Sequence, residues 1–222
     1  MKKVLIAAAL AAPLFASAAN LLTDGSFEQG LTFWTPSNTG PFVYQPTPFD
    51  YATSSINLGE TVVPDNAASM SPDAAGLKAI WFVDDSITNV QTLVSQNFNV
   101  VSAGSYNLGF SVYRTALGSG NPNNAAFTGK IDGVAIATTT MNVSQLSTTT
   151  WTALTGVAAL TPGLHNFSIS FAAFGAGPAA GKDITVDRAY VMAVPEPESY
   201  AMLALGLAFM GAVVRRGRRQ QG

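Results

Sequence analysis

Apolar and polar residues alternate along most of the chain between Asn20 and Ala193, with glycine, proline, asparagine and threonine between the alternating segments. A period of two is typical of strands that bury one face. The clearest examples lie at 90–101, 106–112 and 183–192. Because one face of each is more apolar than the other, antiparallel sheets are favoured. No segment before residue 194 has a sustained helical period, so the pattern predicts an all-β body, an antiparallel β-sandwich.

Turn residues mark where these strands would connect. Asp132-Gly133 separates two alternating segments, and this two-residue spacing predicts a tight hairpin between 128–131 and 134–138. Residues 31–75 contain six prolines, so long loops with short strands are expected there. A further predicted strand has one apolar face, which carries His165, Phe167, Ile169 and Phe171.

The first 19 residues have the three parts of a secretory signal peptide. Lys2 and Lys3 give a positive start, residues 4–15 are apolar and broken only by Pro13, and small residues at 16–19 offer a cleavage site. The apolar run is too short to span a bilayer comfortably, which argues against a permanent anchor. Residues 1–19 are therefore predicted to be removed on export.

The last residues carry a second apolar segment, at 200–214. As a helix it would extend about 22 Å, short of the roughly 30 Å hydrocarbon core, so flanking residues or local thinning would complete a transmembrane helix. Proline does not continue a strand, so Pro195 and Pro197 are expected to end the folded body. Four basic residues favour a cytoplasmic end and place the body outside: Arg215, Arg216, Arg218 and Arg219. An ordinary weak membrane anchor is the alternative.

Composition narrows the function classes. Between residues 20 and 198 the chain has five basic and 13 acidic residues, a formal net charge of −8. This charge would repel phosphates, so nucleic-acid binding is excluded. The chain has no cysteine, so its stability must come from an apolar core, alone or with a bound ion, and not from disulfides.

The order of the tail, a Pro-Glu-Pro triplet, a short apolar segment and an arginine cluster, closely resembles the PEP-CTERM sorting signal over residues 194–219. In that family an exosortase, a membrane-embedded cysteine transpeptidase, recognises the tail and cuts near the triplet. The resemblance implies that Pro195, Glu196 and Pro197 are recognised by this enzyme. It also implies a Gram-negative host that makes exopolysaccharide, and a body held in the periplasm by the inner membrane before it reaches the cell surface.

Short segments of the body resemble galactose-binding-like jelly rolls and related carbohydrate-binding modules. The resemblance implies that residues 20–193 form a jelly-roll sandwich. In such jelly rolls the first and last strands often hold Ca²⁺, so it also implies a structural calcium bound by Glu28 and Asp187, with oxygen ligands of the kind that calcium prefers. Surface charge, or an ion pair with a basic neighbour, is the alternative for Asp187. The segments that carry the likeness are 20–28 with Phe33-Trp34, 95–98, 103–110, Trp151, 162–165 and 184–187.

Aromatic side chains are candidate ligand-binding residues, because sugar rings bury apolar surface on them. Trp34, Tyr44 and Tyr51 are the first candidates, and the proline-rich region that holds both tyrosines is expected to expose side chains. Trp81 and Trp151 are further candidates. Core packing is the alternative for each of them.

Catalytic residues are not indicated. The only histidine, His165, lies on an apolar predicted face and is expected to be packed rather than to act as a base. Asp183 and Asp187 share a face and would be the carboxylates of a hydrolase, with plain surface charge as the alternative. The spacing typical of Cys/His zinc sites is missing.

The sequence is therefore compatible with three functions. The first is a non-enzymatic surface or extracellular-matrix protein, sorted and processed through its tail and associated with exopolysaccharide or biofilm. The second is a carbohydrate-binding module that grips a glycan with loop aromatics. The third, a polysaccharide hydrolase, rests on the carboxylate pair alone.

Overall fold

The structure is a computed structural model. It describes residues 19–38, 45–52, 61–63, 65, 76–84, 90–95, 97–119, 123, 125–174, 182–195, 205–208 and 210–211. The described residues from Ala19 to Val194 belong to one compact unit, referred to below as the body. The alternating segments form sheets, so the predicted all-β body is confirmed.

One sheet has the strand order β1-β4-β12-β7-β8, with β9 also paired to β7. Every strand pairing in the described part of the chain is antiparallel. The strands of this sheet are β1 (Trp34–Asn38), β4 (Val90–Ser95), β7 (Ala125–Ile131), β8 (Val134–Ala135), β9 (Met141–Asn142) and β12 (Phe167–Ala173).

The second sheet has the order β10-β6-β13-β3-β2, and β11 pairs with β5 in a small third sheet. The strands of the second sheet are β2 (Thr47–Asp50), β3 (Lys78–Asp84), β6 (Gly104–Ser119), β10 (Thr152–Leu160) and β13 (Lys182–Ala193). The two strands of the small sheet are β5 (Phe98–Val100) and β11 (Gly163–His165).

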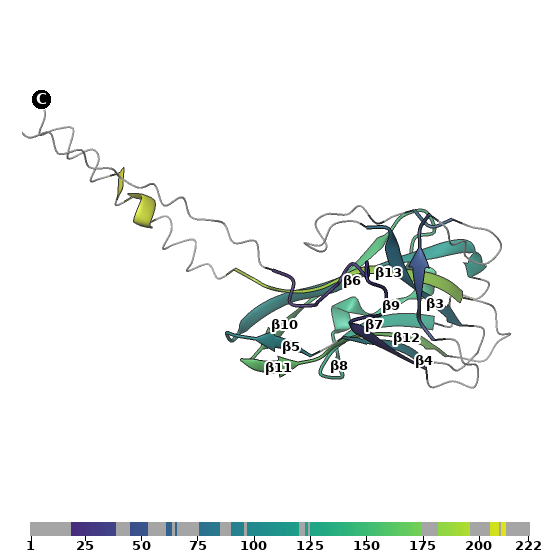
Figure 1. The fold of residues 1–222 in the computed structure, drawn as a ribbon, viewed down its shortest axis with the longest axis horizontal. Helices are drawn as coiled ribbons and strands as arrows, with labels where there is room; N and C mark the ends of the chain where they lie inside the picture. The colour runs from purple at the N-terminus through teal and green to yellow at the C-terminus, as the bar shows by residue number, and fades with distance from the viewer. Residues whose placement is uncertain are drawn as a thin grey trace, which may run out of the picture. The chain divides into compact units, whose positions relative to one another are not determined.

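The two larger sheets pack as layers, with β6, β10 and β13 in one and β4, β7 and β12 in the other (Figure 1). A group of fully buried phenylalanines joins them. The ring centroid of Phe127 on β7 lies 4.7 Å from that of Phe171 on β12, 5.4 Å from Phe82 on β3 and 6.3 Å from Phe110 on β6. This aromatic core holds the sheets face to face.

The predicted hairpin at Asp132-Gly133 connects β7 and β8. Both residues have positive φ, 50° and 77°, as a two-residue type I′ turn requires. The predicted second strand is shorter than expected, because β8 ends at Ala135. The 3₁₀ helix η3 (Ala137–Thr139) follows, and its Thr139 hydroxyl accepts a hydrogen bond from the amide of Gly129.

Two predicted strands each divide between sheets. The alternation at 90–101 is continuous in sequence, but β4 pairs with β1 and β12, while β5 pairs with β11. Likewise His165 belongs to β11 and Phe167 begins β12. A period of two gives the face on which a residue lies, but not the strand that its segment pairs with.

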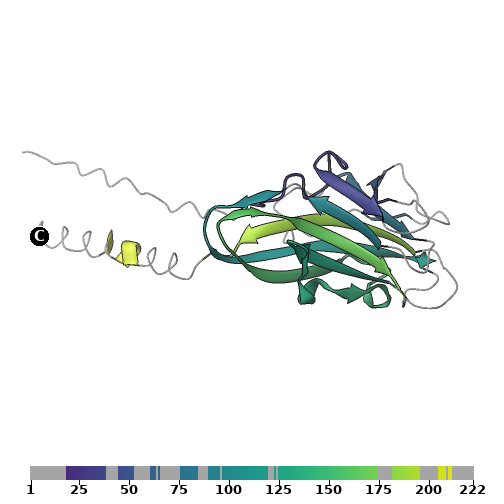
Figure 2. The ribbon, with the colours of Figure 1, turned by 90° about the horizontal axis from the view of Figure 1, so that it is seen from below.

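The last strand is the centre of the second sheet, between β6 and β3, and runs to the end of the body (Figure 2). Its observed range agrees with the predicted 183–192 to within one residue at each end. The first residues of the body lie against it: the amide of Leu21 donates to the Val191 carbonyl at 2.8 Å, and the Asn20 side chain bonds Val191 and Ala189. Both ends of the body therefore meet at β13.

Most of the predicted terminal segments lie outside the described residues, among them 1–18, Glu196, Pro197 and the four C-terminal arginines. Residues 205–208 and 210–211 are helical. Within the described ranges, no helix has both the length and the apolar character needed to cross a membrane. The signal peptide and the transmembrane helix stay predictions.

Candidate functional site

Several of the candidate residues lie on one side of the five-stranded sheet. Alternate residues of β6 point to opposite sides of the sheet, and Leu108, Phe110 and Val112 are fully buried in the core. The other side, which we call the outer face, carries Asn107, Gly109, Ser111 and Tyr113. From Asn107 to Tyr113 this face extends about 20 Å along β6.

Aromatic side chains gather at the Tyr113 end of the outer face. The ring centroid of Trp151 lies 5.5 Å from that of Tyr113 and 6.4 Å from that of Tyr51. The Trp151 indole N–H donates to the Val63 carbonyl at 2.8 Å, which ties the segment 61–63 to this group. Phe49 and Val62 complete a small apolar cluster outside the main core.

A row across the sheet extends this group. Tyr113 of β6 is opposite Thr185 of β13, and Thr185 is opposite Trp81 of β3. Thr185 is fully buried, whereas Trp81 is half-buried. The indole N–H of Trp81 and the hydroxyl of Thr185 are both buried and have no hydrogen-bond partner in the described part of the chain.

A buried ion pair lies beside the aromatic group. Arg188 and Asp65 are each 1% exposed. The Arg188 Nε donates to the Asp65 carbonyl at 3.0 Å and lies 3.5 Å from Asp65 Oδ2. The Ser111 hydroxyl donates to the same carboxylate, so Asp65 attaches its segment of chain to β6 and β13.

Asp187 adds a second buried carboxylate to this network. It accepts hydrogen bonds from the Tyr51 hydroxyl at 2.8 Å and from the Arg188 amide at 2.6 Å. Burial raises the pKa of Asp187 to about 8, although both hydrogen bonds and the Arg188 charge oppose the rise. Burial, together with the neighbouring Asp187, also raises the pKa of Tyr51 well above its ordinary value.

A β-bulge explains how the consecutive residues Asp187 and Arg188 can both join this hydrogen-bond network. The register of β13 against β6 shifts between Asp187 and Tyr190, and Arg188 has a φ of 52°. In a regular strand Asp187 and Arg188 would point to opposite faces. The bulge instead lets both side chains reach the outer face, at the cost of a left-handed backbone conformation.

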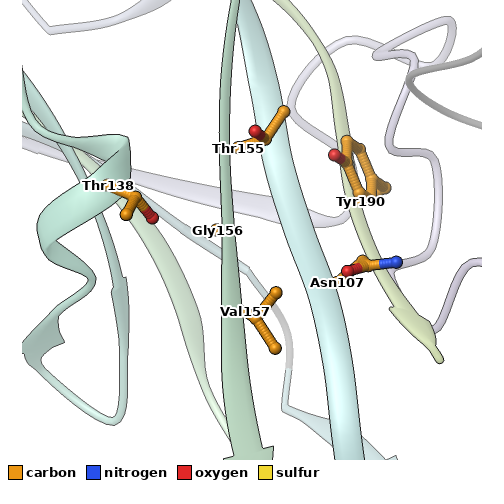
Figure 3. Close-up of a pocket in the computed structure, with 6 residues that line it drawn as sticks. All are labelled: Asn107, Thr138, Thr155, Gly156, Val157 and Tyr190. Carbon is orange, nitrogen blue, oxygen red and sulfur yellow. The ribbon is translucent and has the colours of Figure 1, made fainter.

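The other half of the outer face holds an open hollow of ≈ 560 Å³. Figure 3 shows Thr155 and Val157 of β10, Asn107 of β6 and Tyr190 of β13 around it. Gly109 is opposite both Thr155 and Tyr190. A Cβ at Gly109 would lie 2.6 Å from the Leu154 carbonyl oxygen and 2.8 Å from the Tyr190 hydroxyl, so only glycine fits at this position.

Of the predicted ligand-binding aromatics, Tyr51, Trp81 and Trp151 lie together on the outer face, and Trp34 does not. Trp34 is 3% exposed in the main core, with its ring centroid 4.9 Å from that of Phe27 and its indole N–H bonded to the Asp24 carbonyl. Its interpretation as a stacking residue is therefore corrected, because no sugar ring can reach it. Tyr51 is half-buried on the outer face. Tyr44 lies outside the described residues.

The carboxylates predicted to hold calcium have separate partners. Glu28 accepts hydrogen bonds from the amides of Leu77 and Lys78, at 3.0 and 3.3 Å. Asp187 bonds Tyr51 and Arg188, as described above. As they lie here, the two carboxylates do not fit a shared calcium site, because their oxygens already accept protein hydrogen bonds and Arg188 supplies a cation beside Asp187. The calcium ion stays a prediction without support from this geometry.

The residues considered for catalysis are either buried or hydrogen-bonded to other parts of the fold. Asp183 and Asp187 are each 1% exposed, so neither presents a carboxyl group to solvent. His165 Nδ1 lies 2.7 Å from Asp132 Oδ2, and Nε2 lies 2.9 Å from the Thr161 carbonyl. The hydrogen bond with Asp132 raises the pKa of His165, since a protonated ring donates to both acceptors. His165 thus fastens the β7–β8 hairpin to β11.

Sequence reasoning identified part of this site. It singled out Tyr51 and Asp187 separately, and the structure joins them by a hydrogen bond. It missed Asp65 and Arg188. A signal was present, because Arg188 is one of only five basic residues between residues 20 and 198 and lies in an apolar predicted strand.

Comparison with known proteins gives one match for the tail and different matches for the body. A PEP-CTERM protein-sorting motif matches residues 193–219. No curated protein that was compared is similar to the chain in sequence. The carbohydrate-binding module TmCBM61, solved in complex with beta-1,4-galactotriose, is 16% identical and has a TM-score of 0.50; the match covers 80% of this chain and all of that one.

A second similar structure is the enzymatically active domain of tailspike protein 4 from bacteriophage CBA120. It is 15% identical with a TM-score of 0.50, and the match covers 79% of this chain and 21% of that one. At this level of identity the similarity is one of fold. The body has the β-sandwich fold found in carbohydrate-binding modules.

Proposed function

We propose that the protein is an exported envelope protein whose tail is processed by an exosortase, leaving the β-sandwich outside the inner membrane. The observation that carries this proposal is the position of the sorting motif. The motif begins at residue 193, and β13, the centre of the second sheet, ends at Ala193. The processing signal therefore begins where the last strand of the folded body ends.

The residues at the junction suit recognition by a processing enzyme. The Val194 amide still donates to the Ser105 carbonyl at 2.9 Å, whereas Pro195 is exposed. Proline has no amide hydrogen, so the hydrogen-bond ladder of β13 cannot continue through Pro195. In this proposal the exosortase recognises Pro195, Glu196 and Pro197. The apolar segment holds the tail in the membrane, and the four arginines keep its end in the cytoplasm.

In a Gram-negative host with an exosortase, we expect the mature protein to lack its C-terminal arginines. Intact-mass measurement of the purified protein would show a chain that ends near the Pro-Glu-Pro triplet, with or without an attached group. The same host without its exosortase gene should retain the full tail. A mature chain with Arg218 and Arg219 still present in the exosortase-containing host would contradict the proposal.

A second role, glycan binding by the body, is supported by the outer face. Tyr51, Trp81 and Trp151 are half-buried there, so each residue keeps part of its surface in contact with solvent. Sugar rings pack on such rings through their apolar faces. Within the described part of the chain the Trp81 indole N–H has no hydrogen-bond partner, which makes it a candidate donor to a sugar hydroxyl. An association with exopolysaccharide would follow from this role.

Substitution of Trp81 by alanine is expected to weaken binding to the host's exopolysaccharide by about tenfold or more, because a central aromatic contact is lost. Isothermal titration would measure the change. Phe174→Ala is the matched control, since Phe174 is an exposed aromatic residue that follows β12 in the other sheet. Equal affinities of the two variants and the parent protein would argue against the outer face as the glycan site.

A further inference from the structure

One end of the sandwich combines exposed apolar side chains with the exit of the tail. The strand β13 ends there at Ala193, opposite Tyr106 near the start of β6, and β10 ends there at Leu160, opposite Gly104. Figures 1 and 2 both show the last residues of β13 at the same end as the connections of β5 and β10. We call this the tail end of the body.

Three aliphatic side chains are exposed at the tail end. Val101 is 82% exposed, just after β5, and Leu164 on β11 is 65% exposed. Leu164 is opposite Asn99, two residues from Val101, so the pair lies on one side of the small sheet. Val134 is 67% exposed in β8, which follows the hairpin whose Asp132 bonds Asn166, next to β11. We call these three residues the tail-end patch.

The tail end also carries almost no free charge. In segments 97–106, 131–136 and 158–166, the only Asp, Glu, Lys, Arg or His residues are Asp132 and His165. These two bond each other at 2.7 Å. Elsewhere the body is acidic, and acidic groups would be repelled by an anionic membrane surface. The tail end is therefore the part of the body best suited to contact lipid.

Covalent geometry brings this end close to the membrane. Five residues separate Val194 from the start of the apolar segment at about residue 200, and the six residue-to-residue steps span at most about 20 Å when fully extended. Whatever path they take, the exit point of the tail must stay within that distance of the bilayer while the tail is inserted.

We propose that the tail-end patch rests on the lipid bilayer before the tail is cut. Val101, Leu164 and Val134 enter the interfacial region, where their burial is favourable, and the body stands on the membrane with the Pro-Glu-Pro triplet at the surface. This orientation presents the triplet to a membrane-embedded enzyme. The inference rests on the proposed function, because it requires the tail to be inserted.

The absence of cysteine makes the test direct. Full-length protein, made in a host without exosortase, would carry a single nitrobenzoxadiazole label at Val101→Cys or at Leu164→Cys. Asn123→Cys is the matched control: it is also exposed, but it precedes β7, about 20 Å along that strand from the hairpin. Met210→Cys reports on the tail. Each variant would be reconstituted in protein-free vesicles of phosphatidylethanolamine and phosphatidylglycerol, with and without doxyl-labelled lipid.

We expect the labels at 101 and 164 to shift to shorter emission wavelength and to lose intensity with doxyl lipid, while the label at 123 does neither. If the label at 210 is quenched but those at 101 and 164 behave like the one at 123, the tail is inserted and the patch proposal is wrong. If the label at 210 is also unquenched, the membrane step of the proposed function fails, and the patch proposal fails with it.

Discussion

Replacement of Arg188 by methionine is expected to lower the free energy of unfolding by about 3–5 kcal/mol, because it leaves buried carboxylates without their cation. Arg188 and Asp65 are both 1% exposed and are joined by a hydrogen bond and an ion pair. Methionine keeps most of the side-chain volume, so the loss reflects charge rather than a cavity. Urea unfolding followed by tryptophan fluorescence would measure it, since Trp151 and Trp81 report on the outer face.

The double variant Asp65→Asn/Arg188→Met is the matched control. Removal of both charges should recover part of the loss, since the buried negative charge at Asp65 is then also removed.

The pH dependence of the stability loss distinguishes the loss of the Arg188 charge from a loss of packing. The pKa of Asp187 is raised in the folded state, from 3.8 to about 8. Its contribution to stability is therefore complete below pH 3.8 and is lost as the pH rises through about 8. Because the Arg188 charge lowers this pKa, the Arg188→Met variant should lose more stability at pH 8 than at pH 4. An equal deficit at both values, together with a double variant no more stable than the single one, would contradict this account.

Replacement of Phe127 by alanine is expected to cost a similar amount, about 3–5 kcal/mol, through a cavity between the sheets. Phe127 is fully buried and contacts rings from both layers: Phe171 at 4.7 Å, Phe82 at 5.4 Å and Phe110 at 6.3 Å. The lost contacts therefore weaken the packing of one sheet on the other, and not only the local strand.

Phe174→Ala is the control for this substitution, because Phe174 is 45% exposed and should change stability by no more than about 0.5 kcal/mol. Thermal melts of both variants and the parent protein would compare them. A Phe127→Ala variant that unfolds at the same temperature as Phe174→Ala would show that the phenylalanine group does not hold the layers together.

The fold was largely predictable because it depends on local pattern. The period of two at 106–112 and 183–192 identified β6 and β13, and the Asp132-Gly133 turn identified a hairpin. What could not be predicted was the pairing of strands that are distant in sequence. The continuous alternation at 90–101 gives no sign that residues on either side of Asn97 join different sheets.

The site was less predictable, for a physical reason. Sequence alternation predicts that Asp187 and Arg188 face opposite ways, and only the bulge with its positive φ brings both to the outer face. Asp65, in the proline-rich region, shows no periodicity, and its partners Ser111 and Arg188 are 46 and 123 residues away. Trp34 was predicted as a ligand contact but lies in the core. An aromatic residue near a loop is compatible with either position, so the sequence alone could not decide between them.

The central place of β13 has a consequence for biogenesis. The strand that completes the middle of the sheet is the last one synthesised, and it also pairs with Asn20 and Leu21 at the other extreme of the body. Until residue 193 has left the ribosome, β6 and β3 lack the neighbour that joins them, so the sandwich cannot close before that point. Such late closure, dominated by long-range contacts, is slow. A chain whose central strand pairs last remains incompletely folded for longer, and a secretion channel accepts unfolded chains.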